Sequence, residues 1–341
     1  MTTVWGVHND TLADELLTEG FISAGWDRLG DLREVPDGRE GLKRELAEWY
    51  PDDKPRAIAG WAGILLRLRD EMKPGDIVVA PYRPDSTINI GVITSGYWFA
   101  AEAPTHRHRR SVSWSKAGLS RASFSQSALY EIGSLLTVFQ IRKHAEEFLA
   151  VLDAEDVDDP ARPEPAELVP TDPEIDAIDE PRASRIERHT RDFILEALHR
   201  EITHVEFEEF AADLLRSMGY QARVTQYSQD GGVDVIAHRD PLGVEPPQIK
   251  VQVKHRTGTV GAPEVQQLIG TQQPGEFLLF ITLGAYSKDA RSIERQRSGL
   301  RLMSGEDVVG LAIEHYDKLP ARWRDLIPLT PVLVVADSAD A

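Results

Sequence analysis

A glycine turn that leads into an aspartate is the first sign of chemistry in this sequence. Asp230-Gly231-Gly232 predicts a tight turn, because glycine adopts backbone angles that other residues rarely take. The turn feeds a predicted strand that begins near Asp234, and a carboxylate at a strand end can bind a divalent ion. An ordinary hairpin with a solvated aspartate at the strand edge is the alternative.

A polar face on the following strand supplies further chemical groups. In Ile249–Lys254, alternation places Lys250, Gln252 and Lys254 on one face and aliphatic side chains on the other. A sheet edge with one wet face is the alternative. Together with Asp234, however, the pattern contains what phosphodiester hydrolysis needs. It offers oxygen ligands for an ion that polarises phosphate and activates water, and a lysine where negative charge develops.

The elements that must position these residues follow from the hydrophobic pattern. A helix with the capping-box pattern Thr203–Glu206 is expected to bury its apolar residues from Phe207 to Met218 and to end at Gly219. The other expected helices cover Arg185–Arg200, 262–273 and 287–297, and the expected strands cover Ala222–Thr225, Val233–Ala237, Ile249–Lys254 and Phe277–Thr282. This order predicts a mixed sheet with helices on its faces.

These segments resemble a known nuclease family. Similarity to the Mrr-like branch of the PD-(D/E)xK restriction endonucleases runs through FEEFAADLLRSMGY (207–220), DGGVDVIA (230–237), VQVK (251–254), EFLLFITLGAYSKDA (276–290) and LRLMSGEDVVGL (300–311). The resemblance covers about residues 200–315 and implies an Mrr-like nuclease domain over 185–330.

The resemblance also implies roles for individual residues. Asp234 is the implied chief metal ligand, and Gln252 stands where the family more often has an acid. The carbonyl of Val253 is a further implied ligand. Lys254 is implied to activate the attacking water or to stabilise the pentavalent phosphorus. The implied cofactor is Mg²⁺ or Mn²⁺.

Nucleases of this fold often add a glutamate from the first helix. Here Glu206 is engaged by the capping box and Glu209 lies opposite the apolar stripe, so we favour Glu208 on its flank. A solvated surface glutamate is the alternative. His255 and Arg256 directly follow the site and are expected to contact DNA phosphate, with a solvated turn as the alternative.

Composition narrows the chemistry further. The absence of cysteine excludes disulfides, thiolate zinc sites and cysteine nucleophiles, which favours a hard metal ion. The net charge of -18 lowers the expectation of DNA binding, although residues 152–183, with twelve acidic residues and two arginines, carry -10 of it. Neither a secretory signal nor a run of ~20 apolar residues is evident, so we expect a soluble, cytoplasmic protein.

An acidic, proline-rich segment divides the chain. Residues 151–184 contain six prolines among their acidic residues and cannot bury enough apolar surface to fold. We expect an extended linker that joins a first domain, residues 1–150, to the nuclease domain.

The first domain is predicted to be a curved sheet or barrel with helices outside it, so the fold class is α/β and α+β. Trp61 is expected in its core, on the apolar face of a helix. The expected strands are Val4–Val7, Phe21–Ser23, Ile77–Ala80, Asn89–Ser95 and Val112–Trp114, and the expected helices are Gly38–Tyr50 and Arg56–Met72.

This domain resembles the PUA-like folds of the EVE and YTH type. The similarity lies in GFISAGWDRLGDL (20–32), KPGDIVVAPY (73–82), IGVITSGYWF (90–99) and HRRSVSW (108–114). It implies a reader that flips a modified base into an aromatic pocket, for which Trp26, Tyr97 and Trp98 are the candidates. The implied phosphate contacts are Arg107, Arg109 and Arg110. Core packing of the aromatic rings and a solvated basic strand edge are the alternatives.

The hypothesis that unites both halves is a modification-dependent, type IV-like restriction endonuclease. It would act on double-stranded DNA carrying modified bases, as a homodimer for double-strand cleavage. One rival keeps the nuclease but makes the first domain a sensor of a nucleotide messenger or a protein partner, and only ligand binding separates the two. Another rival is a non-catalytic DNA-binding protein, which the intact set of Asp234, Gln252 and Lys254 disfavours.

Overall fold

The chain forms two compact units. The computed structural model describes residues 2–9, 12, 14–82, 86–134, 136–154, 163–166, 183–225, 232–241, 243, 245 and 247–336. The first unit comprises residues 1–117, 130–154 and 161–179, and the second comprises residues 118–129, 155–160 and 180–341. No helix in these described ranges is long and apolar enough to cross a membrane.

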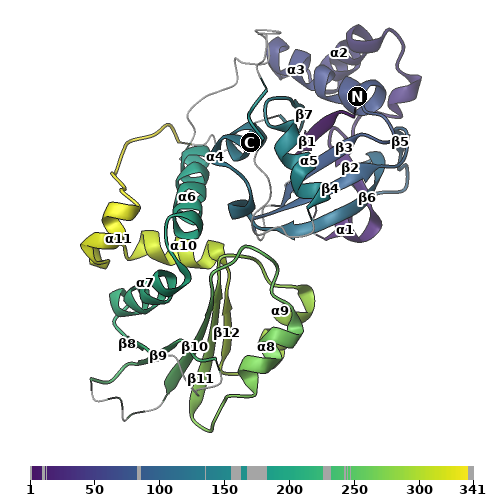
Figure 1. The fold of residues 1–341 in the computed structure, drawn as a ribbon. Helices are drawn as coiled ribbons and strands as arrows, with labels where there is room; N and C mark the ends of the chain where they lie inside the picture. Colours follow the sequence, from purple (N-terminus) through teal and green to yellow (C-terminus); the bar gives the residue numbers. More distant parts are fainter. Residues whose placement is uncertain are drawn as a thin grey trace. The chain divides into compact units, whose positions relative to one another are not determined.

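A curled mixed sheet organises the first unit (Figure 1), which confirms the predicted fold class. Its strands run in the order β2-β6-β4-β3-β1-β7, and β5 pairs with β6. Only one of the described strand pairs in this sheet, β1 with β3, is parallel. The strands are β1 (Val4–Val7), β2 (Phe21–Ala24), β3 (Ile77–Tyr82), β4 (Thr87–Ile93), β5 (Trp98–Phe99), β6 (His108–Leu119) and β7 (Val138–Ile141).

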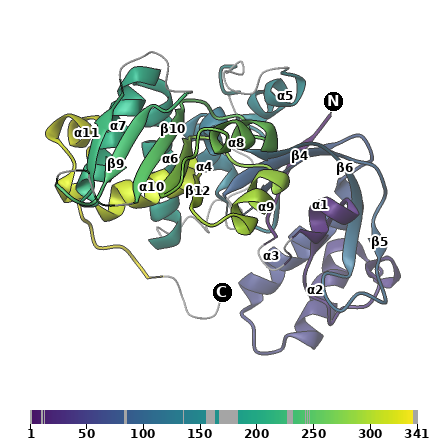
Figure 2. The same ribbon diagram turned by 90° about the horizontal axis from the view of Figure 1, so that it is seen from below.

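Helices α2 and α3 pack side by side against this sheet (Figure 2). Leu42 and Leu46 of α2 meet Ile58 and Leu65 of α3 in one buried cluster. Trp61, which we expected inside the core, is half-buried and packs against that cluster from outside. The helices are α1 (Glu15–Glu19), α2 (Gly38–Trp49), α3 (Pro55–Leu66) and α5 (Ala145–Asp153), and α4 (Gln126–Ile132) spans the point where the chain passes from the second unit back to the first.

The expected helix Arg56–Met72 changes its geometry near the end. Its α-helical part stops at Leu66, and a π-helical turn, Arg67–Glu71, follows. The turn is closed by the N–H of Met72, which donates to the carbonyl of Arg67. Leu68 and Met72 are both buried, so this turn still contributes to the core.

The second unit contains a five-stranded sheet in the order β12-β11-β10-β9-β8. β10, β11 and β12 are parallel to one another, whereas β8 and β9 pair antiparallel. The strands are β8 (Gln221–Val224), β9 (Val235–His238), β10 (Gln248–Lys254), β11 (Glu276–Thr282) and β12 (Leu300–Met303). The predicted mixed sheet is therefore confirmed.

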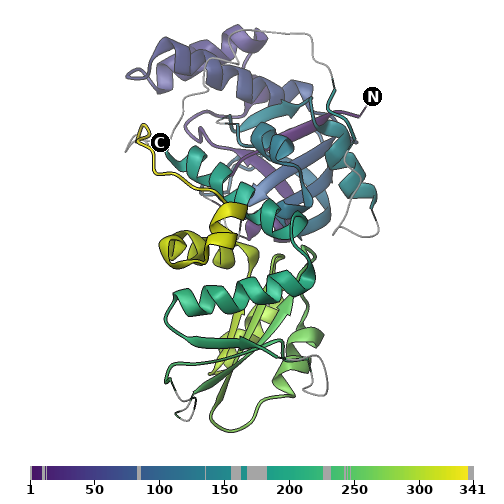
Figure 3. The same cartoon turned by 60° about the vertical axis from the view of Figure 1, so that its left-hand side comes forward.

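Helices cover both faces of this sheet. Helices α6, α7, α10 and α11 share one core with the sheet, and the teal and yellow ribbons of Figure 3 gather on that side. Helices α8 and α9 close a smaller core on the other face. The helices are α6 (Ala183–Arg200), α7 (His204–Ser217), α8 (Ala262–Ile269), α9 (Lys288–Gln296), α10 (Gly305–Glu314) and α11 (Ala321–Leu326).

A short segment that we expected in the first domain belongs to the second unit. Gly118–Leu129 is bound there by the guanidinium of Arg121, which donates to both carboxylate oxygens of Asp192 on α6 at 2.5 and 2.6 Å. Both side chains are buried. Removing one partner of such a pair typically costs about 3–5 kcal/mol, because the other charge stays buried and unpaired. The domain boundary expected near residue 150 misses this segment.

Most of the expected linker, residues 155–162 and 167–182, lies outside the described residues. At its margins, α5 continues to Asp153 and buries Val151, and α6 begins at Ala183. The expected linker range of 151–184 therefore overlaps a helix at each end.

Candidate active site

Asp234 is fixed at the entrance to β9 by bonds to the neighbouring strand. Its backbone N–H donates to the carbonyl of Val251 at 2.8 Å. Its Oδ2 accepts a hydrogen bond from the backbone N–H of Val253 at 2.7 Å. One carboxylate oxygen is thus tied to β10, which leaves Oδ1 to interact with a ligand.

Strand β10 presents the alternating faces that the sequence predicts. Val251 and Val253 are fully buried in the larger core. Gln252 and Lys254 lie on the opposite face, where they pair in register with Phe280 and Thr282 of β11. Gln252 is itself buried. A polar side chain inside the sheet layer is costly unless it has a partner or a function.

Close approach to Gln252 explains the glycine of the preceding turn. Gly232 has a φ of +88°, in the left-handed region. A Cβ there would lie 3.2 Å from Nε2 of Gln252, tighter than ordinary packing. Both restraints favour glycine at this position. Asp230 and Gly231 of the predicted turn lie outside the described residues.

Helix α7 brings a second carboxylate to Asp234. The predicted capping box is present, because Thr203 Oγ1 accepts from Glu206 N–H and the Glu206 carboxylate accepts from Thr203 N–H. Glu209 is paired with Arg322 at 2.6 Å. Glu208 is 8% exposed, and its Oε1 lies 3.1 Å from Nε2 of His204. Of Glu206, Glu208 and Glu209, Glu208 is the one whose pKa is shifted by the charges of Asp234 and Lys254.

The charges of these residues act on one another. Burial raises the pKa of Asp234, against the N–H of Val253 and the charge of Lys254, which lower it. Burial also raises the pKa of Glu208, and the negative charge of Asp234 raises it further. Two carboxyl groups that resist ionising beside each other gain from a cation between them.

Metal binding at this place should depend on pH, because only ionised carboxylates are good ligands. We expect Mn²⁺ affinity to fall on acidification, starting above the ordinary carboxyl pKa values of 3.8 and 4.5, since both pKa values are raised. Calorimetric titration with Mn²⁺ across a pH series measures this. Glu208→Gln should weaken binding at every pH, whereas Glu209→Gln, one residue along, should not. Affinity that holds constant down to the ordinary carboxyl range would contradict the expectation.

The two residues after β10 are engaged within the protein. His255 lies 2.8 Å from the carbonyl of Leu198 through Nε2, and its ring packs against Phe207 at 5.2 Å. Burial lowers its pKa. Arg256 donates to both carboxylate oxygens of Glu264 at 2.6 and 2.7 Å. The structure thus gives His255 a packing role, and Arg256 would have to leave its partner to contact a phosphate.

The arginines of the basic cluster in the first unit also donate hydrogen bonds within the protein. Arg110 is 2% exposed, and its guanidinium donates to the carbonyls of Leu68, Arg69 and Ser95. A phosphate contact would break these bonds, so we correct the expectation for Arg110. Arg107 and Arg109 are half-buried; the side chain of Arg107 donates to Ala103, and that of Arg109 donates to His106.

The aromatic residues of the expected pocket differ in their burial and in their contacts. Tyr97 is buried in the core; its hydroxyl accepts from Leu32 N–H and lies 2.9 Å from Nδ1 of His108. Burial raises the pKa of Tyr97 to about 12. Trp26 is half-buried, takes a φ of +64° and has its ring 5.7 Å from that of Trp61. Both polar contacts of Tyr97 thus lie within the protein, and its stacking on a base stays a prediction.

Trp98 differs from those two aromatic residues. It lies half-buried on β5, with the guanidinium of Arg109 5.7 Å from its ring centre. Its indole Nε1 is buried, and among the described residues it has no hydrogen-bond partner. An unpaired buried donor costs about 1–3 kcal/mol, which an acceptor on a ligand would recover.

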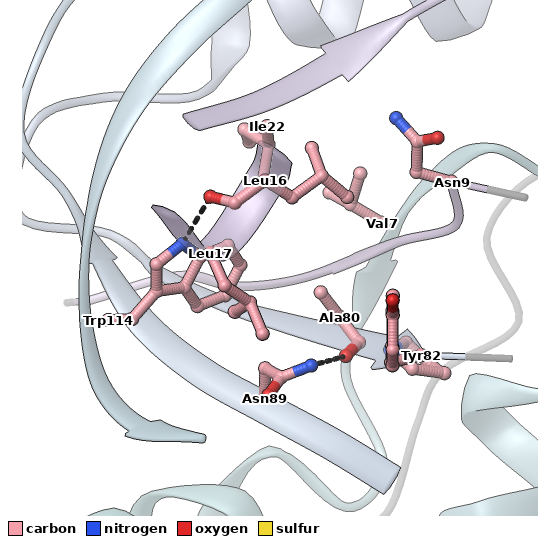
Figure 4. A pocket seen from close by; sticks show the side chains of 10 residues that line it. Val7, Asn9, Leu16, Leu17, Ile22, Ala80, Tyr82, Asn89 and Trp114 are labelled. Carbon is pink, nitrogen blue, oxygen red and sulfur yellow. Dashed lines mark hydrogen bonds between the residues drawn. The ribbon is translucent and has the colours of Figure 1, made fainter. Parts of the chain in front are cut away.

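A small cavity lies elsewhere in this unit, between the ends of β1 and β3 and helix α1. Figure 4 shows it lined by Val7, Asn9, Leu16, Leu17, Ile22, Ala80, Tyr82, Asn89 and Trp114. The Nε1 of Trp114 donates to Leu16 and the Nδ2 of Asn89 donates to Ala80, as the dashed lines show. Its volume of about 10 Å³ holds roughly one water molecule, far less than a base.

Family comparisons assign the two halves differently. Residues 199–312 match a family described as restriction endonuclease (Mrr_cat), and this match confirms the Mrr-like resemblance. The matched range contains Glu208, Asp234, Gln252 and Lys254. Residues 3–142 match a domain of unknown function (DUF8426). That match neither supports nor contradicts the PUA-like resemblance.

Among characterised proteins, the chain is 31% identical over 171 residues to the type IV methyl-directed restriction enzyme EcoKMrr of Escherichia coli K12. The match covers 48% of this chain and 55% of that enzyme, so the chain spans about half the length of this relative.

Two solved structures show weaker likeness. The DNA modification-dependent restriction endonuclease AspBHI is 17% identical with a TM-score of 0.34, over 81% of this chain and 74% of its own. The MspJI restriction endonuclease, solved with a 27-mer oligonucleotide, is 14% identical with a TM-score of 0.33, over 78% and 66%. At these TM-scores the backbones agree only loosely, so the assignment depends on the sequence match of residues 199–312.

Proposed function

We propose that this protein is a modification-dependent restriction endonuclease that hydrolyses phosphodiester bonds of double-stranded DNA with a divalent metal ion. The observation that carries the proposal is the mutual arrangement of Asp234, Glu208 and Lys254. The charges of Asp234 and Lys254 both act on the carboxyl of Glu208, and all three residues lie within the range that matches the endonuclease family.

The oxygen donors of the site suit a hard ion such as Mg²⁺ or Mn²⁺. In the part of the chain that the structure describes, no group of three or more His, Cys, Asp or Glu residues could hold a metal. Two carboxylates must therefore be completed by neutral oxygens. Asp234 and Glu208 would bind the ion together with the amide of Gln252, and we propose the carbonyl of Val253 as a further ligand. Such an ion, when bound, polarises the phosphate and lowers the pKa of water.

The remaining steps are performed by the protein. Strand β10 holds Asp234 through the N–H of Val253, so the carboxylate is oriented before substrate arrives. Lys254, on the same strand, places a positive charge where negative charge accumulates on the phosphorus oxygens. A homodimer, which would present one such site to each DNA strand, is part of the proposal.

Cleavage assays on matched duplexes test this function directly. The duplexes should share one sequence and differ only in cytosine or adenine modification, and each should be assayed with Mg²⁺ and with excess chelator. We expect cleavage only with the metal, and faster cleavage of at least one modified duplex. Full cleavage activity in excess chelator would contradict the metal-dependent mechanism. Equal cleavage of all duplexes would favour the rival in which the first unit senses a different ligand.

The first unit is proposed to select the target, in line with its resemblance to PUA-like base readers. Trp98 is the best-supported contact, because its ring is half-buried and its N–H is unpaired among the described residues. Arg109 beside its ring, together with Arg107, is proposed to bind phosphate. Trp26 stays a second candidate.

Replacing Trp98 by alanine should weaken binding to modified DNA about tenfold or more, because stacking of one base is worth roughly 1–3 kcal/mol. Binding to unmodified DNA should change far less. Trp49→Ala is the control, since Trp49 is an exposed tryptophan of the same unit, at 47%, but lies on α2. Fluorescence anisotropy with labelled duplexes measures both. Equal losses on modified and unmodified DNA would show that Trp98 reads no base.

A further inference from the structure

The side chain of His204 lies against that of Glu208 in the candidate active site. His204 is the first residue of α7, and Glu208 follows one helical turn later. Nε2 of the imidazole lies 3.1 Å from Oε1 of the carboxylate. The spacing of four residues brings both side chains to the same side of the helix.

The surroundings of Glu208 explain why such a partner matters. The carboxylate is largely withdrawn from solvent, and the charge of Asp234 opposes its ionisation. A buried carboxylate without a donor loses its solvation and gains nothing in return. The N–H at Nε2 of an imidazole, neutral or protonated, supplies that donor.

The side chain of His204 is not one of the groups that cap helix α7. The capping box of α7 uses Thr203 and Glu206, and the side chain of His204 takes no part in it. The side chain of His204 is 49% exposed, so it is not part of the packed core. Its charge would nevertheless reach both Glu208 and Asp234. An exposed side chain that lies 3.1 Å from a site carboxylate points to a role in the site.

We infer that His204 is a positioning residue, whose Nε2–H holds Oε1 of Glu208 and so leaves Oε2 oriented for the divalent ion. This inference rests on the proposed function, because it assigns Glu208 to that ion. It concerns a hydrogen bond that the separation of 3.1 Å allows and that a neutral imidazole can also donate. Partners of this kind around a metal ligand typically contribute 10–100-fold to metal affinity.

The experiment compares His204→Ala, His204→Gln and Val205→Ala in the full chain. Glutamine carries an amide nitrogen at about the place of Nε2, so it can keep the bond to Glu208. Val205 occupies the same helical turn and is 60% exposed, which makes it a control for the helix end. Mn²⁺ affinity is measured by calorimetry without DNA, and cleavage is measured separately at saturating and limiting Mn²⁺.

We expect His204→Ala to weaken Mn²⁺ binding about tenfold or more, His204→Gln to recover most of it, and Val205→Ala to change nothing. Cleavage by His204→Ala should be slow at limiting Mn²⁺ and should approach the wild-type rate at saturation. Wild-type Mn²⁺ affinity in His204→Ala would overturn the inference. Equal losses in the alanine and glutamine variants would overturn it too. A wild-type protein that binds Mn²⁺ but cleaves no DNA would refute the proposed function while still testing this contact.

Discussion

Asp234→Asn is expected to lower metal-dependent DNA cleavage by about three orders of magnitude or more. Loss of a single preorganised polar group typically costs on the order of 10²–10³ in rate. Asp234 should exceed that, because its loss also weakens the binding of the ion that activates water. Asparagine keeps an oxygen that can accept the N–H of Val253, so β9 and β10 should stay in register. Single-turnover cleavage of a modified duplex measures the rate.

The stability of this variant separates a chemical defect from a folding defect. Because burial raises the pKa of Asp234, its ionised form destabilises the folded state at any pH above the ordinary carboxyl pKa. The neutral asparagine removes that penalty, so the metal-free variant should melt no lower than the wild type. Added Mg²⁺ should raise the melting temperature of the wild type and leave that of the variant nearly unchanged. A variant that is inactive and melts much lower would mean that Asp234 is structural.

The placement of the candidate site residues on the elements of the second unit could be predicted because it depends on local patterns. Alternation along Ile249–Lys254 fixes which side chains share a face, and the register between β10 and β11 confirms it. The capping box at Thr203 and Glu206 likewise needs only a four-residue pattern. Because it engages Glu206, that glutamate could be set aside and Glu208 favoured. Patterns of this range do not depend on the rest of the fold.

Contacts between distant segments could not be predicted in this way. Tyr97 and Arg110 look like binding residues in the sequence, because aromatic and basic side chains near strand ends are common in binding sites. In the structure their polar atoms are bound by the backbone of Leu32 and of Leu68, Arg69 and Ser95. A sequence shows that a polar group exists but not whether the protein itself already satisfies it.

Further elements and contacts were missed for different reasons. Strand β12 has only four residues, Leu300–Met303, too few for a convincing alternation. The docking of Gly118–Leu129 on the second unit depends on the pair of Arg121 and Asp192, which are 71 residues apart. The proximity of His204 to Glu208, by contrast, could have been predicted, because a histidine four residues before Glu208 on a predicted helix shares its face.

Lys254→Met should slow cleavage by on the order of 10²–10³ while leaving metal binding intact or slightly tighter. The loss of one positive charge explains both the slower cleavage and the unchanged or tighter metal binding. The positive charge of Lys254 lowers the pKa of both Asp234 and Glu208, so it favours their ionised forms, but it also repels a divalent cation. Well above the carboxyl pKa values, where both groups are ionised anyway, only the repulsion of the ion is lost. The negative charge that develops on the phosphate then lacks its compensating ammonium.

The same strand offers a matched control for this variant. Lys250 lies on the same face of β10, but its ammonium is paired with Glu276 at 2.8 Å and donates to the carbonyl of Thr271. Lys250→Met should therefore lower the melting temperature, because Glu276 loses its partner, and should leave the cleavage rate close to that of the wild type. Single-turnover rates, Mn²⁺ titrations and melting curves on both variants decide the point. Lys254→Met with an unchanged rate, or with a rate loss that extra Mn²⁺ repairs, would show that Lys254 serves metal binding or DNA docking and not the chemical step.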